Sequence, residues 1–175
     1  MLTQVAKAFI YQQGFFLLQL RDSNPDISYP NLWSFFGGGI DTGETPWQAL
    51  QRELKEELEW QPDQQGAFLY RWTNTEIHCQ THFFAVPFTG KRPQLVLHEG
   101  QAMDWFSLNE LLILQAITTH DKLHVIKALD MVDNNFLARD TRKNETQPAR
   151  EWKNKMNYLY QQKISKCVSL SIKAK

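Results

Sequence analysis

The sequence predicts one α+β domain with helices layered against a sheet, and three observations lead to that fold class. The chain of 175 residues is long enough for one domain with an appendage, but too short for two full domains. Its 42% hydrophobic and 22% charged residues are typical of a globular protein and exclude a disordered or coiled-coil chain. Strand-like runs come first, one amphipathic helix follows, and further strands precede the last helices. That order favours an α+β or layered α/β/α architecture.

Two runs rich in β-forming residues open the chain. Val5–Tyr11 and Phe15–Leu20 flank the short turn Gln12-Gln13-Gly14, which predicts a β-hairpin. Two prolines make Asp22–Asn31 a loop. The apolar run Leu32–Phe36 is predicted to be extended, and three consecutive glycines follow it.

A helix begins with a clear signal at Thr45. Thr45 is an N-cap candidate, Pro46 suits the first helical position, and Gln48 completes a capping box. Pro62 limits how far the helix extends. Apolar residues recur at helical spacing and are expected to face the core: Trp47, Leu50, Leu54 and Leu58.

The second half of the chain predicts four more strands and two helices. Ser107 and Glu110 form a second capping box ahead of an apolar run at Leu111–Leu114. Thr119 is expected to cap another helix. The apolar face of that helix would contain Leu123, Ile126, Leu129 and Val132. The predicted strands are Ala67–Trp72, Glu76–Phe88, Gln94–Leu97 and Met103–Phe106.

The net charge of the chain is zero but unevenly distributed. From Arg139 onward there are ten Lys or Arg and three Asp or Glu, a net +7, so the preceding residues carry −7. We therefore expect a domain at 1–138 and a basic C-terminal helical extension at 139–175. In the extension, Asp140–Gln147 has the composition of a linker and Pro148–Ile164 that of a helix.

Three interpretations of this extension stay open. Its helix would pack on the domain or on a second subunit of a homodimer, or its lysines would contact nucleic acid, or it would be disordered. No RNA-binding signature accompanies it, so nucleic acid is not the favoured partner.

The sequence shows no targeting or membrane-spanning pattern. Met1–Val5 lacks a basic cluster, and no stretch reaches 18 apolar residues. The two cysteines, Cys79 and Cys167, lie far apart, so neither a disulfide framework nor a cysteine-built zinc site is expected. These observations predict a cytoplasmic protein with no membrane partner.

The helix that begins after Thr45 carries a cluster of carboxylates. Glu53, Glu56 and Glu57 are spaced i, i+3 and i+4, so they share one face, beside the apolar stripe. Three carboxylates on one turn repel each other, and a divalent cation would remove that repulsion. Carboxylate oxygens suit Mg²⁺ or Mn²⁺. By itself this spacing is more typical of a solvated acidic helix face than of a metal site.

The surrounding residues resemble the signature of the Nudix hydrolase family, the MutT-like enzymes. The similar segment is Gly38–Trp60, and two of its positions depart from the family pattern. Glu59 stands in place of the second glycine of the signature, and Trp60 in place of its final aliphatic residue. A glycine there would end the helix in a left-handed conformation, which Glu59 must either avoid or adopt with strain. The residues in register with the signature are Gly38, Glu44, Arg52, Glu53, Leu54, Glu56 and Glu57.

The resemblance implies a Nudix-type α/β/α sandwich with a mixed sheet, and hydrolysis of a nucleoside diphosphate linked to another group. It implies that Mg²⁺, or alternatively Mn²⁺, is the cofactor. The metal would neutralise the pyrophosphate and lower the pKa of the attacking water. The implied metal ligands are the carboxylates of Glu53, Glu56 and Glu57 and the backbone carbonyl of Gly38.

The resemblance also suggests four residues with catalytic roles. Glu53 would act as the base if it is not only a ligand. Arg52 would orient one of the carboxylates, or form only a surface ion pair. Glu44 would support the ligands or act as base, or be a solvated turn residue. Glu99, at the end of an apolar run, would be a later-loop ligand or base, or a plain loop acid.

Three functions therefore follow as hypotheses. The first is a metal-dependent hydrolase of a phosphoanhydride bond in a nucleotide-type small molecule, such as a nucleoside triphosphate or a nucleotide sugar. The second is an RNA 5′-end pyrophosphohydrolase that holds RNA with its basic extension. The third is a non-catalytic Nudix module that senses a nucleotide or binds nucleic acid. The intact carboxylate set places the third behind the other two.

Overall fold

The computed structural model describes residues 2–75 and 77–132, and those up to Ala128 belong to one compact unit. The predicted extension at 139–175, with its linker and helix, lies outside the described residues. No helix in the described part of the chain is long and apolar enough to cross a membrane.

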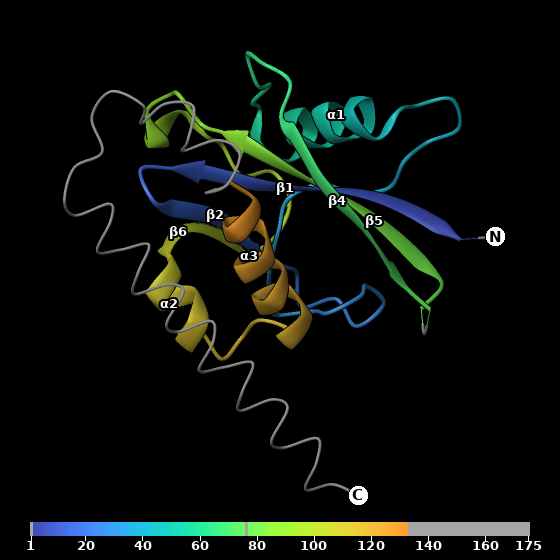
Figure 1. Cartoon of the computed structure of the whole chain (residues 1–175). Helices are drawn as coiled ribbons and strands as arrows, with labels where there is room; N and C mark the ends of the chain where they lie inside the picture. The colour runs from blue at the N-terminus through green and yellow to red at the C-terminus, as the bar shows by residue number, and fades with distance from the viewer. Residues whose placement is uncertain (1, 76, 133–175) are drawn as a thin grey trace, which may run out of the picture. The chain divides into compact units, whose positions relative to one another are not determined.

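Six strands form one mixed sheet, the kind of sheet that the family resemblance implied (Figure 1). The strand order is β3-β2-β1-β5-β4, and β6 pairs with β2. β1 and β5 run parallel with Thr3 opposite Cys79, and the remaining strand pairs are antiparallel. The predicted hairpin is confirmed, because β1 and β2 meet through Gln13 and Gly14, both at positive φ. The strands are β1 Thr3–Gln12, β2 Phe15–Leu20, β3 Trp33–Ser34, β4 Ala67–Asn74, β5 Cys79–Pro87 and β6 Ala102–Ser107.

The glycine-rich segment 37–39 lies against β1, where β1 no longer pairs with β2. β1 pairs with β2 only over its last three residues. Closer to its N-terminus, β1 bonds instead to the chain that follows β3. Ala8 forms a bridge with Phe36, and the Ala6 N–H donates to the Gly38 carbonyl at 2.9 Å. The sheet therefore holds the glycine segment by its backbone.

Helix α1, Pro46–Leu58, covers one face of the sheet (Figure 1). Its predicted capping box is present: the Gln48 N–H donates to Thr45 Oγ1 and the Thr45 N–H donates to Gln48 Oε1. Burying one leucine side chain is worth roughly 1.5–3 kcal/mol, so the apolar stripe fixes the helix on the sheet. The buried stripe and the sheet residues under it are Leu50, Leu54, Leu58, Ala6, Ala8, Ile10, Phe84 and Val86.

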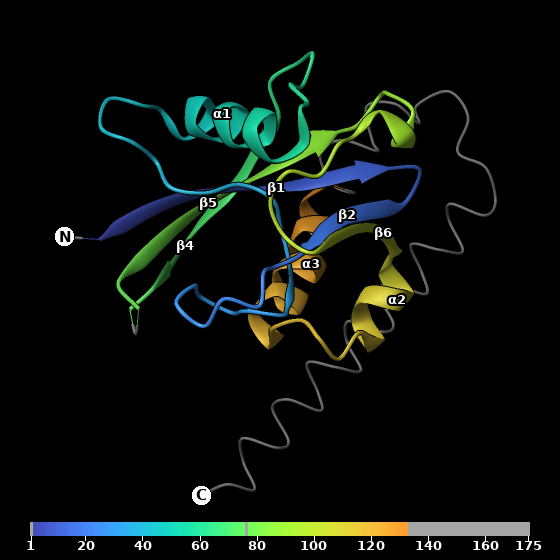
Figure 2. The same cartoon turned by 180° about the vertical axis from the view of Figure 1, so that it is seen from behind.

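The opposite side of the sheet carries α2, Leu108–Ile113, and α3, Thr119–Val132 (Figures 1 and 2). The predicted capping box of Ser107 and Glu110 begins α2. Within α3, the buried His124 ring lies 4.5 Å from the Phe83 ring, and its Nδ1 lies 2.9 Å from the Tyr70 hydroxyl. α3 is therefore tied to β5 and to the edge strand β4.

Helix α1 ends at Glu59, which adopts the left-handed conformation with φ 51° and ψ 23°. Its N–H donates to the carbonyls of Leu54 and Lys55 and closes the helix end. A non-glycine residue costs about 1–2 kcal/mol in this conformation, so Glu59 takes the strained alternative. His98 lies across the helix end: its N–H donates to the Glu57 carbonyl at 2.9 Å, and its Nε2 lies 2.7 Å from Glu59 Oε1.

Three local predictions were wrong. Gln94–Leu97 is not a strand: a 3₁₀ turn at Arg92–Gln94 precedes it, and the Val96 N–H donates to the end of α1. The cap of α3 is Thr118, whose Oγ1 accepts the Asp121 N–H at 3.0 Å, rather than Thr119. Leu123 is 54% exposed, whereas the neighbouring His124 and Val125 are buried, so its predicted place on the apolar face of α3 is wrong. The side chains of Ile126, Leu129 and Val132 lie outside the described part of the structure.

Candidate functional site

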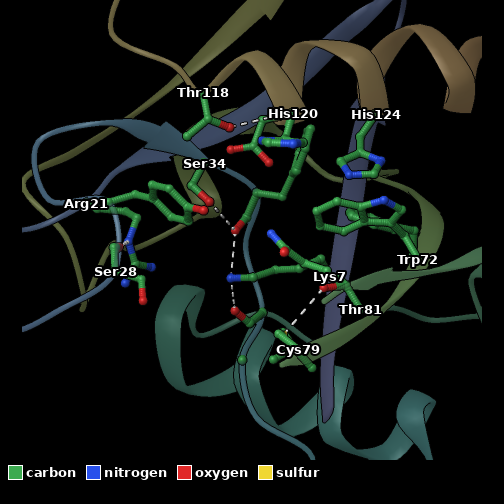
Figure 3. A pocket seen from close by; sticks show the side chains of 18 of the residues that line it. Lys7, Arg21, Ser28, Ser34, Trp72, Cys79, Thr81, Thr118, His120 and His124 are labelled. Carbon is green, nitrogen blue, oxygen red and sulfur yellow. Dashed lines mark hydrogen bonds between the residues drawn. The ribbon is translucent and has the colours of Figure 1, made fainter. Parts of the chain in front are cut away.

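A cavity of about 340 Å³ brings together the glycine segment, α1, β1 and the start of α3 (Figure 3). Glu53 and Glu57 of α1 line it beside Gly37–Gly39. Lys7 comes from β1, and Asp121 from the first turn of α3. The α1 carboxylates reach the cavity at the glycine segment, where β1 and β2 no longer pair.

Glu57 is the most deeply held carboxylate of the acidic helix, with 3% of the residue exposed. Its Oε2 accepts the Gly37 N–H at 2.8 Å, and its Oε1 accepts from Gln19 Nε2 at 2.9 Å. Burial raises the pKa of Glu57, while the nearby Lys7 charge and these two hydrogen bonds act in the opposite direction. The fold therefore keeps a carboxylate in a place where its negative charge is costly.

Lys7 stands beside Glu57 in the interior of the cavity. Its Nζ donates to the carbonyl of Phe35 at 3.1 Å and to the carbonyl of Gly37. Burial lowers the pKa of Lys7, and the Glu57 charge opposes that shift. Lys7 and Glu57 thus bind the same residue, Gly37, one through its carbonyl and the other through its N–H.

Two glycines of the segment lie in close contact with their surroundings. A Cβ on Gly37, which has φ 109°, would lie 2.3 Å from the Ala6 carbonyl oxygen, so no side chain fits there. A Cβ on Gly38 would lie 2.4 Å from Glu53 Oε2, so a side chain there would displace the Glu53 carboxylate.

Arg52 organises the other carboxylates of the helix together with Glu44, which precedes it. It donates two hydrogen bonds of 3.0 Å to Glu44, one of 2.7 Å to Glu53 and one of 2.9 Å to the Gly39 carbonyl. Its hydrogen bonds hold the pKa of Glu44 below the ordinary value. Glu56 is the outermost member, 3.5 Å from Arg52, with a side chain that is 60% exposed.

The predicted metal ligands are not equivalent in position. Glu53 and Glu57 line the cavity, whereas Glu56 does not. Within 2–75 and 77–132, no three His, Cys, Asp or Glu side chains converge as a ready-made metal cluster. The donor chemistry nevertheless fits a hard divalent cation, because Glu53 Oε2 and the Gly38 backbone come together with no intervening side chain. The Gly38 carbonyl accepts one hydrogen bond, which leaves its second lone pair available.

The predicted catalytic residues are also brought near this place. Glu44, Arg52 and Glu53 form one bonded group, and Glu99 lines the cavity from the loop after His98. The sequence analysis missed Lys7 and Gln19, the two side chains that complete the surroundings of Glu57. The sequence feature that could have indicated them is a polar residue within each of two apolar runs, Val5–Tyr11 and Phe15–Leu20.

Comparison with known proteins identifies the family. A NUDIX domain model matches residues 1–129. The CTP pyrophosphohydrolase of Escherichia coli K12 is 37% identical over 112 residues, which are 62% of this chain and 78% of that protein. The RNA pyrophosphohydrolase of Francisella tularensis subsp. mediasiatica is 34% identical over 79 residues, 43% of this chain and 44% of that protein. The chain thus matches less than half the length of this second relative.

A solved structure gives the same result for the fold. The MutT NUDIX hydrolase from Burkholderia pseudomallei superposes with a TM-score of 0.60 at 21% identity, covering 75% of this chain and 98% of that one. The family match includes the glycine segment, the acidic helix and the six strands described above. The chain therefore belongs to the Nudix hydrolase family.

Proposed function

We propose that this protein is a divalent-metal-dependent pyrophosphohydrolase that cleaves a phosphoanhydride bond in a nucleotide-type small molecule. One observation carries the proposal: two carboxylates of the acidic helix, Glu53 and Glu57, meet the Gly37–Gly38 backbone at the wall of a cavity. A merely solvated acidic helix face would not hold a carboxylate that is 3% exposed.

Nudix hydrolases generally need a divalent metal, and Mg²⁺ suits the oxygen donors present here. Glu53, Glu57 and the Gly38 carbonyl would hold it, with Glu56 completing the set from the solvent side. The bound ion would neutralise the pyrophosphate and make the attacking water more acidic. Gln19 and the Gly37 N–H fix the Glu57 carboxylate, and Arg52 fixes that of Glu53. Glu99, which lines the cavity, would act as a further ligand or as base.

The rest of the cavity suits a nucleoside. Trp72 and Phe83 contribute aromatic surface, and Asn74, Thr81 and Asp121 contribute polar groups. An apolar pocket with a few polar groups is typical of small-ligand sites. The E. coli relative named CTP pyrophosphohydrolase makes a nucleoside triphosphate the first substrate to test.

RNA with a 5′-triphosphate is the second candidate substrate. Its support is the name of the Francisella relative, which matches over 43% of this chain. Cleavage of 5′-triphosphate RNA in preference to free nucleoside triphosphates would establish it. Tight nucleotide binding without any cleavage would instead favour a non-catalytic module.

The test compares Glu57→Gln with Glu56→Gln. Pyrophosphate and phosphate release would be measured from nucleoside triphosphates, nucleotide sugars and 5′-triphosphate RNA, each with Mg²⁺, Mn²⁺ or EDTA. We expect the wild type to need the metal, and Glu57→Gln to lower kcat by about 10²–10³-fold, the cost of losing one key electrostatic group. The exposed Glu56→Gln is the matched control, with a smaller loss. Full activity of Glu57→Gln would contradict the proposal.

A further inference from the structure

Lys7 is a charged residue in the interior of an otherwise apolar strand. Its neighbours Ala6 and Ala8 are fully buried on the α1 side of β1, while Lys7 faces the cavity on the other side. Figure 3 shows its side chain extending through the cavity, with the amine between two backbone oxygens. A strand residue placed only for packing would not carry an ammonium group into this space.

The hydrogen bonds of Lys7 leave part of its donor capacity available. An ammonium group has three N–H donors. Two of them are taken by the carbonyls of Phe35 and Gly37. No other described residue accepts a hydrogen bond from Lys7, so the third donor is available to a molecule in the cavity.

The charges around Lys7 indicate which kind of molecule this is. Glu57 and Glu53 lie close on one side and Asp121 on another, and all three favour the charged amine. Arg21, which also lines the cavity, acts against it. If a divalent ion neutralises the charges of Glu53 and Glu57, the positive charges of Lys7 and Arg21 are offset only by the negative charge of Asp121. An anionic oxygen from the substrate would restore the balance.

The position of Lys7 selects one part of a nucleotide. Through Gly37, which both residues bind, Lys7 is adjacent to Glu57, where the reacting bond would lie, and the same cavity is lined by Asp121. The phosphate that lies between the reacting bond and the sugar is the one that stays on the nucleoside.

We propose that Lys7 is a substrate-binding residue that donates its third N–H to an oxygen of the phosphate that remains attached to the nucleoside. This inference rests on the proposed function, because it assumes that a nucleotide occupies the cavity. It makes Lys7 a specificity-determining residue: it would favour nucleotides over uncharged nucleosides.

The test is a binding measurement in Mg²⁺, because neither a nucleoside monophosphate nor a nucleoside contains the phosphoanhydride bond that the protein would cleave. Matched pairs of nucleoside monophosphate and nucleoside, such as CMP with cytidine and GMP with guanosine, would be titrated by calorimetry into wild type, Lys7→Met and Lys7→Arg. For the best-binding pair we expect Lys7→Met to weaken the monophosphate about tenfold, the loss of one charged hydrogen bond, and the nucleoside less than about twofold. Lys7→Arg should keep most of the preference for the monophosphate.

Two controls separate a phosphate contact from a structural role. Cys79→Ala removes a neutral side chain from the same cavity and should leave the ratio of the two affinities unchanged. Thermal unfolding of each variant checks that the glycine segment is still held. Equal weakening of both ligands by Lys7→Met, or no weakening, would overturn the inference, as would failure of every pair to bind wild type. A chain that hydrolyses nothing but keeps the Lys7-dependent preference would overturn the proposed function and leave this inference standing.

Discussion

The acidic helix holds its carboxylates in two opposite ways. The buried group consists of Glu57 with Gln19, Gly37 and Lys7 around it. The outer group consists of Arg52 and its acidic partners near solvent, among which Glu56 is 60% exposed. Packing and buried hydrogen bonds fix the buried group, whereas ion pairs fix the outer group. We expect stability to depend on the buried group, while the outer group affects mainly activity.

The largest effect is expected from a substitution at Gly37, in the buried group. A Cβ there would clash with the Ala6 backbone and with Leu50 at φ 109°, so Gly37→Ala should lower the free energy of unfolding by about 3 kcal/mol. Gly39→Ala is the matched control, because a Cβ on Gly39 meets nothing within 4 Å. Urea unfolding of both variants measures the difference. Equal stabilities would show that Gly37 is not confined as described.

Replacing one polar side chain in each group compares the two groups directly. Gln19→Leu leaves the buried Glu57 carboxylate without one donor and should cost about 2 kcal/mol of unfolding free energy. Arg52→Gln breaks partly exposed ion pairs and should cost less than about 1 kcal/mol. The effect on activity should be marked in Arg52→Gln although its effect on stability is small. Because Arg52 orients Glu53, its loss should lower kcat about tenfold. A larger stability loss in Arg52→Gln would reverse our comparison.

The stability contributions of the two groups should depend on pH with opposite signs. Burial raises the pKa of Glu57, so its contribution favours folding at low pH and is lost as pH rises through the folded-state pKa. Arg52 lowers the pKa of Glu44, so its contribution is present above the unfolded-state pKa and lost as pH falls. As the pH rises from 4 to 7, the unfolding free energy of Glu57→Gln should increase relative to that of wild type, and that of Glu44→Gln should decrease relative to it. Urea unfolding in EDTA would test this, and parallel curves would contradict the assignment.

The smallest expected effect concerns the C-terminal end of α1. Both glycine and alanine at position 59 lose the contact with His98, but glycine suits the left-handed conformation, whereas alanine keeps the strain. Glu59→Gly should therefore exceed Glu59→Ala in unfolding free energy by about 1 kcal/mol. Thermal unfolding of the two variants measures the difference. If alanine is the more stable, Glu59 is not held in this conformation in solution.

The sequence predicted best what neighbouring residues decide. Both capping boxes and the first hairpin are local, and each is present as predicted. Gln94–Leu97 has strand composition, but its backbone bonds to the end of α1, and no local pattern reveals a partner so distant in sequence. The sequence spacing likewise does not distinguish the exposed Glu56 from the buried Glu57, because the burial of Glu57 depends on Gln19 and Gly37, which come from other elements. Lys7 carries no spacing signal at all, since a single charge inside a strand has no periodicity.

The parallel pairing of β1 with β5 has a consequence for how the chain folds. Thr3 lies opposite Cys79, and the register continues to Tyr11 opposite Pro87, so the central pair joins segments 76 residues apart. The β1–β2 hairpin can form from local contacts, but the middle of the sheet must wait for a large loop to close. During synthesis on the ribosome, the first strand would therefore emerge long before its central partner. Until β5 arrives, the apolar side chains of β1 and the acidic helix have no complete sheet to pack on, and that interval is when this protein is most exposed to aggregation.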